Sequence, residues 1–203
     1  MYLPDLDTFR HQLTIKYQGV LNMGAFNTEV NSSVAGCVKV GATAPDFTLT
    51  TEQNVEWRLS DHIGNVVVLL FYPQNETLVC TKQLCSVRDN WGKYLETKAE
   101  IVGISPGTPD EHQTFSDRRQ LPIPLLADPD RVVTRIFGKH WLFPVNLTRA
   151  IVVIDAKGIV RNRDVMMRAF LPSDDNVIMD IYEARGDALS DRYKQLSTRL
   201  KKI

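Results

Sequence analysis

Cysteine is scarce in this chain, with three among 203 residues. A small secreted scaffold stapled by disulfides needs more cysteines and an even number of them, so that class is excluded. A charge excess is also missing, because 24 Lys and Arg residues balance 24 Asp and Glu residues. Proteins that bind nucleic acid or an anionic membrane carry a basic excess. We therefore expect a small molecule or another protein as the partner, and no nucleic acid.

Long apolar runs are absent too. The longest, residues 66–72, is far short of the roughly 20 residues that span a bilayer, so we predict no transmembrane helix and no membrane partner. The first seven residues lack the basic head, apolar middle and small-residue cleavage site of a secretory signal. We therefore expect a cytoplasmic protein. In that reducing compartment a cysteine pair is typically catalytic, redox-active or metal-binding.

The length suits one domain with appendages. We predict an N-terminal extension over residues 1–38, a domain over 39–185 and a C-terminal helical tail over 186–203. Apolar residues recur at near-helical spacing early in the extension and at spacings of four and three in the tail. The tail pattern covers only about two heptads, which favours packing on the parent domain over a coiled coil.

Strand and helix patterns alternate within the predicted domain. Residues 66–72 are β-branched and aromatic without alternation, which indicates a central strand buried on both faces. Further strands are expected at 47–50, 55–59, 100–105, 125–127, 150–155 and 159–163, and helices at 78–98, 109–120, 131–137 and 174–185. The last two strands suit a hairpin with Gly158 in its turn. The order predicts an α/β fold with a mixed central β-sheet flanked by helices.

The strongest candidate for a reactive residue is Cys80, in the first turn of the helix that follows the central strand. A thiol there meets free backbone N–H groups and the positive end of the helix dipole, and both favour the nucleophilic thiolate. Thr77, three residues earlier, is placed to bond the sulfur or an oxygen held against it. In a purely structural interpretation, Thr77 caps the helix, Pro73 ends the strand and Cys80 is a small buried apolar residue.

Cys85 follows Cys80 on the same predicted helix. Five helical residues separate two Cα atoms by roughly 8.7 Å on divergent faces. A disulfide tolerates about 7 Å at most, so a bond between the two sulfurs requires the first helical turns to unwind. We expect a resting form and a rearranged oxidised form.

The motif Pro73-x-x-x-Thr77-x-x-Cys80 resembles the active-site motif of the peroxiredoxins. The Cys-x4-Cys spacing resembles that of their peroxiredoxin Q branch, also called bacterioferritin comigratory protein. Other similar stretches, in the family's order, are Val40-Gly41-x3-Pro45-Asp46-Phe47, Leu59-Ser60-Asp61-x2-Gly64, Gly103-Ile104-Ser105-Pro106, Leu121-Pro122-x-Pro124 and Arg149-x4-Ile154-Asp155. The likeness covers residues 39–185. It departs from that branch at Leu78-Val79, where Pro-Gly is common.

The resemblance implies a thioredoxin-like fold and a thiol peroxidase that reduces hydrogen peroxide and organic hydroperoxides. Cys80 would be the peroxidatic cysteine, oxidised to a sulfenic acid, and Cys85 the resolving cysteine that forms an intramolecular disulfide with it. Gln83 would have a minor supporting role. Thioredoxin or a similar dithiol would recycle the disulfide, no cofactor or metal is expected, and the chain would be a monomer or a homodimer.

The resemblance also assigns the residues around the sulfur. Thr77 and Arg149, with the backbone N–H groups of Val79 and Cys80, would hold the two peroxide oxygens, and Pro73 would shield the pocket from water. A guanidinium presents several donors in a fixed fork, which suits two neighbouring oxygens better than an ammonium group does. Donors aimed at charge that develops in the transition state are a usual source of rate.

Two alternatives stay open from the residues. The chain could be a general thiol-disulfide oxidoreductase, which the thioredoxin-like fold also hosts, although such enzymes use Cys-x-x-Cys. It could also be a zinc or metal-sensing module built from Cys37, Cys80, Cys85 and His112. Cys37 itself could be an alternative resolving thiol, an intermolecular partner or inert.

Overall fold

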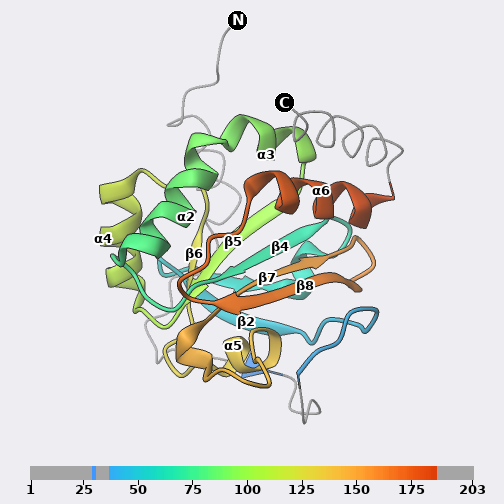
Figure 1. The fold of residues 1–203 in the computed structure, drawn as a ribbon, viewed down its shortest axis with the longest axis horizontal. Coiled ribbons are helices and arrows are strands. Elements are labelled where there is room, and N and C mark those ends of the chain that lie inside the picture. Colours follow the sequence, from blue (N-terminus) through green and yellow to red (C-terminus); the bar gives the residue numbers. More distant parts are fainter. Residues whose placement is uncertain (1–28, 31–36, 187–203) are drawn as a thin grey trace, which may run out of the picture.

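The computed structural model describes residues 29–30 and 37–186, which form an eight-stranded mixed β-sheet with helices on both faces (Figure 1). The strands follow the order β1-β2-β6-β5-β4-β7-β8, and β3 pairs with β2. Their bounds are β1 Glu29–Val30, β2 Phe47–Thr51, β3 Glu56–Arg58, β4 Val67–Phe71, β5 Glu100–Ser105, β6 Leu125–Ala127, β7 Thr148–Ile154 and β8 Val160–Met167.

Helices α2, α3 and α6 lie on one side of the sheet and α5 lies on the other, as Figure 1 shows. The helix bounds are η1 Leu59–His62, α2 Leu78–Asp89, α3 Trp91–Thr97, α4 Pro109–Arg119, α5 Val132–Phe137, η2 Val145–Leu147 and α6 Asp174–Arg185. Among the helices of the described residues, none has both the length and the apolar character needed to cross a membrane.

The alternation of side chains along β4 divides the core between the two faces of the sheet. Val68 and Leu70 pack in a cluster with residues of α2, α3, α4 and α6. Val67, Leu69 and Phe71 pack in a second cluster with residues of β2 and α5. β4 is parallel to β5 and antiparallel to β7, and all of its residues are buried. The predicted central strand is confirmed, because both of its faces are covered.

Most predicted elements are confirmed, including the strands at 100–105 and 125–127. The single helix expected over 78–98 is wrong, because Asn90 divides it into α2 and α3. The Asn90 side chain donates to the Ser86 carbonyl over 3.1 Å. An asparagine amide that bonds a nearby backbone group competes with the helical hydrogen bonds and ends the helix there.

The hairpin of β7 and β8 is confirmed and is longer than expected at its open end, where β7 begins at Thr148 and β8 continues to Met167. Its turn contains Gly158 with a φ of 79°, a left-handed conformation that glycine adopts without strain. The Asp155 carboxylate accepts from the backbone N–H groups of Lys157 and Ile159, each at 2.9 Å. The turn is therefore held by one side chain and permitted by one glycine.

The segment predicted as an N-terminal extension contributes to the sheet. Glu29 and Val30 pair antiparallel with Thr48 and Phe47 of β2. The residues with the helical pattern near the N-terminus, and the predicted tail after Gly186, lie outside the described residues. Gly186 ends α6 with a φ of 68°, as expected for a glycine at a helix C-terminus.

Candidate active site

Residues 73–77 connect the buried strand β4 to the start of α2. Pro73 is buried, and its carbonyl accepts a hydrogen bond from Arg131 Nη2 at 3.3 Å. Thr77 is the N-cap residue of α2, and its carbonyl accepts from Thr81 N at 2.8 Å. The Thr77 side chain makes no capping hydrogen bond. Its hydroxyl is therefore not used to cap α2, and the simple capping interpretation is not supported.

Cys80 lies in the first turn of α2 with only 1% of its surface exposed. Its Sγ accepts a hydrogen bond from Arg149 Nη2 at 3.3 Å. Arg149 is on β7 and is completely buried. The structure thus brings together the predicted nucleophile and the predicted cation, which are 69 positions apart in the sequence.

The rest of the Arg149 guanidinium has a sparse set of partners. Nη1 donates to Gln83 Oε1, and Nη2 also approaches the Arg168 carbonyl at 3.4 Å. Arg149 Nε and Gln83 Nε2 are buried and find no acceptor among the described residues. No carboxylate of the described residues forms an ion pair with Arg149. A buried cation is costly unless an anion compensates it, and the Cys80 sulfur is the group in contact with the guanidinium that could carry such a charge.

Cys85 lies further along the same continuous helix and is half-buried. All three cysteines are free thiols. Both Cys80 and Cys85 fall within α2, which runs unbroken from Leu78 to Asp89. The helical spacing that precludes a direct disulfide therefore applies to this structure.

The metal-binding alternative finds no support in the arrangement of its four residues. Cys37 Sγ donates to the Lys139 carbonyl at 3.6 Å, whereas the His112 ring is buried on α4 with Nε2 3.2 Å from the Leu126 carbonyl. In the part of the chain that the structure describes, no group of three or more His, Cys, Asp or Glu residues is arranged to hold a metal ion. The structure does not gather the predicted ligands.

Glu76, immediately before Thr77, was not among the predicted site residues. It has a φ of 57°, a left-handed conformation that is uncommon for a side chain of this size. Its carboxylate pairs with Arg118 at 2.8 Å and Arg119 at 3.1 Å on α4. Partners more than forty positions away leave no local sequence pattern. The loop before Cys80 is thus strained and tied to α4, a contact that sequence reasoning missed.

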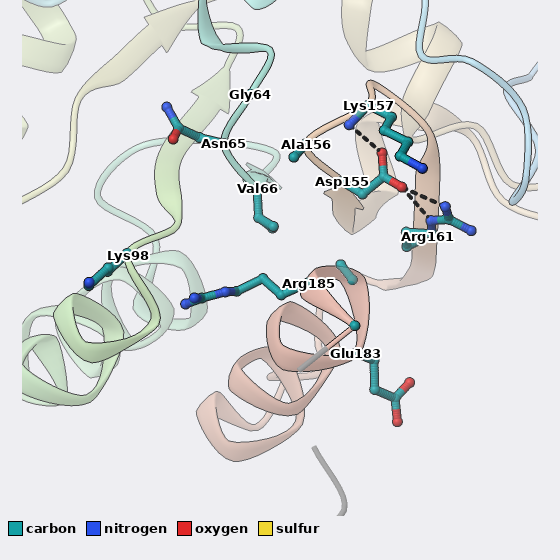
Figure 2. Close-up of a pocket in the computed structure, with 12 residues that line it drawn as sticks. Gly64, Asn65, Val66, Lys98, Asp155, Ala156, Lys157, Arg161, Glu183 and Arg185 are labelled. Atoms are coloured by element: carbon teal, nitrogen blue, oxygen red, sulfur yellow. Dashed lines mark hydrogen bonds and ion pairs between the residues drawn. The ribbon is translucent and has the colours of Figure 1, made fainter. Parts of the chain in front are cut away.

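A surface hollow of about 710 Å³ lies at a different place, between the β7–β8 turn and the end of α6 (Figure 2). Asp155, Arg161 and Arg185 line it, and none of the predicted site residues does. Its two arginines are already engaged: Arg161 pairs with Asp155 at 2.6 Å, and Arg185 donates to the Thr97 carbonyl at 2.6 Å. This hollow is separate from the thiol site.

The sequence matches the model of the AhpC/TSA family over residues 40–163. It is 35% identical over 140 residues to a chloroplastic peroxiredoxin Q from Populus jackii, covering 66% of this chain and 64% of that protein. It is 39% identical over 129 residues to a chloroplastic peroxiredoxin Q from Triticum aestivum, covering 63% and 59%. The chain thus spans less than two thirds of the length of either relative.

Solved structures show the same fold. The crystal structure of peroxidoxin BcpB from Mycobacterium tuberculosis has a TM-score of 0.62 at 31% identity, covering 72% of this chain and 98% of that one. Xanthomonas campestris peroxiredoxin Q has a TM-score of 0.60 at 20% identity, covering 68% and 91%. The predicted thioredoxin-like fold is confirmed, and so is the resemblance to the peroxiredoxin Q branch. The chain belongs to the AhpC/TSA family.

Proposed function

We propose that this protein is a thiol peroxidase that reduces hydrogen peroxide and organic hydroperoxides with Cys80 as the nucleophile. The observation that carries the proposal is the 3.3 Å hydrogen bond from the buried Arg149 guanidinium to the Cys80 sulfur. With no carboxylate of the described residues paired to it, this cation favours a negative charge on the sulfur. The family membership and the names of the relatives support the same activity.

The first step is attack of the Cys80 thiolate on one peroxide oxygen. The S–O bond forms, the O–O bond breaks, and the leaving hydroxide or alkoxide takes up a proton to become water or an alcohol. The sulfur is oxidised to a sulfenic acid and the peroxide is reduced. The backbone N–H groups of Val79 and Cys80 lie in the first helical turn, where no intrahelical acceptor exists. With Thr77 and Arg149, they would stabilise the charge that develops on the oxygens.

The second step joins Cys85 to the sulfenic acid. Its thiol sulfur attacks Cys80 Sγ, an S–S bond forms, and the sulfenic oxygen leaves as water. Because both residues lie on the intact helix α2, the first turns must unwind before the sulfurs can meet. Thioredoxin or a similar dithiol would then reduce the disulfide and become a disulfide itself. Cys-x-x-Cys oxidoreductases close their disulfide without such unwinding, so the helix argues against that alternative.

The proposal includes a cytoplasmic location and a catalytic domain over residues 39–185. A reducing compartment is where a reactive cysteine pair is kept available for catalysis rather than locked in a structural disulfide. The site and all described elements except β1, which pairs with β2 from residues 29–30, lie within that range.

The proposal is tested by peroxide consumption coupled to a thioredoxin system, with parent, Cys80→Ser, Cys85→Ser and Cys37→Ser proteins. We expect Cys80→Ser to lose consumption and Cys37→Ser, the matched control, to retain it. Cys85→Ser should complete one turnover and then stop. Retained consumption in Cys80→Ser would overturn the proposal. An intramolecular disulfide in Cys85→Ser would transfer the resolving role to Cys37.

A further inference from the structure

A buried polar network lies behind the loop of residues 73–77. The Asn75 side chain bridges two rings: Tyr72 Oη donates to Asn75 Oδ1 at 3.0 Å, and Asn75 Nδ2 lies 2.9 Å from His112 Nδ1. His112 is completely buried. One end of this network is Tyr72, directly after β4, and the other is His112 on α4.

The hydrogen-bond partners define the state of the His112 ring. The Leu126 carbonyl can only accept, so His112 Nε2 carries a proton and donates to it at 3.2 Å. Asn75 Nδ2 can only donate, so His112 Nδ1 accepts and carries no proton. The arrangement therefore fits the neutral ring. A second proton on Nδ1 would oppose the Asn75 Nδ2 donor, and its accommodation would require the amide to turn over and reverse its hydrogen bond with Tyr72.

The surroundings of His112 agree with a neutral ring. The ring of Tyr72, the residue directly after β4, faces it. From β5 the Ser105 hydroxyl lies 3.4 Å from Nε2, and β6 contributes only a backbone carbonyl. The charged neighbour is Glu111, on α4 itself. Burial lowers the pKa of His112, and its hydrogen bonds with Ser105 and Leu126 and the Glu111 charge oppose this only in part.

Gly107 closes the network tightly. A Cβ atom placed on Gly107 would lie 2.6 Å from His112 Cε1 and 2.9 Å from both Asn75 Nδ2 and His112 Nδ1. The backbone of Gly107 thus packs directly on the contact between the two side chains. This offers a way to disturb the contact without removing either partner.

We infer that Asn75 and His112 form a positioning pair, in which the neutral His112 ring holds the loop that carries Thr77 through the Asn75 side chain. The loop has reason to need such support, since Glu76 is in a left-handed conformation and its surface ion pairs with α4 are worth little. The inference rests on the proposed function, because it places Thr77 where a peroxide oxygen would be bound.

The test uses Asn75→Leu, Asn75→Asp and Gly107→Ala, with Gly92→Ala as the matched control. A Cβ on Gly92 meets nothing within 4 Å. We expect Asn75→Leu and Gly107→Ala to slow Cys80 oxidation by peroxide about tenfold, since small misplacements of a binding group are costly. Gly92→Ala should match the parent. Thermal unfolding of each protein separates this effect from a loss of fold.

Asn75→Asp provides a pH-dependent measurement that distinguishes a positioning role from a merely structural one. A carboxylate accepts a hydrogen bond from the doubly protonated His112, so this variant favours the ring state that the parent disfavours. The ratio of its oxidation rate to that of the parent should rise as the pH falls from about 8 to about 5. A ratio independent of pH, or parental rates in Asn75→Leu and Gly107→Ala, would overturn the inference.

A nuclear magnetic resonance titration separates this inference from the proposed function. In the parent protein, the Thr77 amide signal should shift with the same midpoint as the His112 ring signals, whether or not peroxide is reduced. A Thr77 amide signal that does not shift as His112 titrates would refute the positioning pair. Absence of Cys80 oxidation in the parent would refute the proposed function instead.

Discussion

Arg149 and Cys80 are 69 positions apart in the sequence, yet Arg149 Nη2 lies 3.3 Å from Cys80 Sγ. The sheet creates this contact. β4 and β7 pair antiparallel with Phe71 opposite Ala150, so the end of β4 lies beside the start of β7. The chain leaves β4 through the loop and enters α2, whose first turn then faces Arg149. The register of two central strands thus determines the geometry of the site.

Replacing Arg149 with lysine should slow Cys80 oxidation by about 100-fold, because one ammonium group cannot reproduce the donor fork that contacts Cys80 and Gln83. The measurement is the second-order rate constant under single-turnover conditions. Arg135→Lys, at an exposed arginine of α5, is the control and should leave the rate unchanged. A parental rate in a folded Arg149→Lys protein would contradict the assigned role.

Thr77→Val should separate catalysis from stability. The Thr77 hydroxyl makes no capping bond, so its loss should change the free energy of unfolding by less than about 0.5 kcal/mol. The oxidation rate should nevertheless fall about 10- to 100-fold. Thr108 is the matched contrast, because its hydroxyl accepts from Glu111 N in a capping box, and Thr108→Val should cost about 1 kcal/mol. A destabilised Thr77→Val protein with a parental rate would reverse the assignment.

Disulfide formation should unwind only the first part of α2. Asp174 at the start of α6 accepts hydrogen bonds from Ser86, from Asn90 Nδ2 at 3.0 Å and from Tyr94 Oη at 2.7 Å. These contacts anchor the chain immediately after Cys85. After peroxide treatment, hydrogen exchange should increase over residues 78–85 and stay slow over 86–97.

Asp174→Ala removes that anchor and should extend the rapid exchange of the oxidised protein beyond residue 86. The reduced variant should lose about 1 to 3 kcal/mol of stability, because three buried or half-buried donors lose their acceptor. Lys93→Ala is the control, since Lys93 reaches the exposed neighbour Asp175 at only 3.4 Å. Identical exchange boundaries in parent and Asp174→Ala proteins would show that Asp174 does not define the hinge.

The stability contributed by Asp155 should depend on pH. Burial raises the pKa of this carboxyl, but hydrogen bonds from Ile159, Lys157 and Arg161 outweigh that effect and hold the pKa below its usual range. Because the folded pKa is depressed, the contribution is present above the unfolded value of about 4 and is lost as the pH falls through the folded value.

Asp155→Asn should therefore cost about 1 to 2 kcal/mol at neutral pH, when the charged bond to Arg161 is lost. Chemical denaturation of parent and variant from about pH 7 to about pH 2 measures the difference. The two stabilities should converge on the acid side. A difference that stays constant down to the lowest pH would show that the Asp155 charge is not the source.

Local patterns were sufficient for the central strand and for the Cys80 motif. The run of residues 66–72 is apolar throughout. Such a run predicts a strand buried on both faces without any knowledge of the elements that pack against it. The break at Asn90 could not be predicted, because it depends on one side chain bonding Ser86 and Asp174. No sequence pattern near Asn90 predicts that its side chain will bond Asp174 on α6.

The supports of the site were beyond local patterns for the same reason. Asn75 and His112 are 37 positions apart, and their contact exists only because the loop of residues 73–77 and α4 meet in the fold. His112 was considered a metal ligand from residue type alone. In the structure it is buried and contacts Asn75 and the Leu126 carbonyl instead. Residue identity predicted which side chains could react, and tertiary packing determined which neighbours hold them.

Trapping of a Cys80 sulfenic acid tests the central claim most directly. Cys85→Ser protein is treated with one equivalent of peroxide in the presence of a sulfenic-acid-selective reagent, and the labelled peptides are identified by mass spectrometry. The account predicts one label per chain, on Cys80, with one peroxide consumed. A protein that consumes peroxide while Cys80 stays unlabelled, or that carries the label on Cys37, would contradict it.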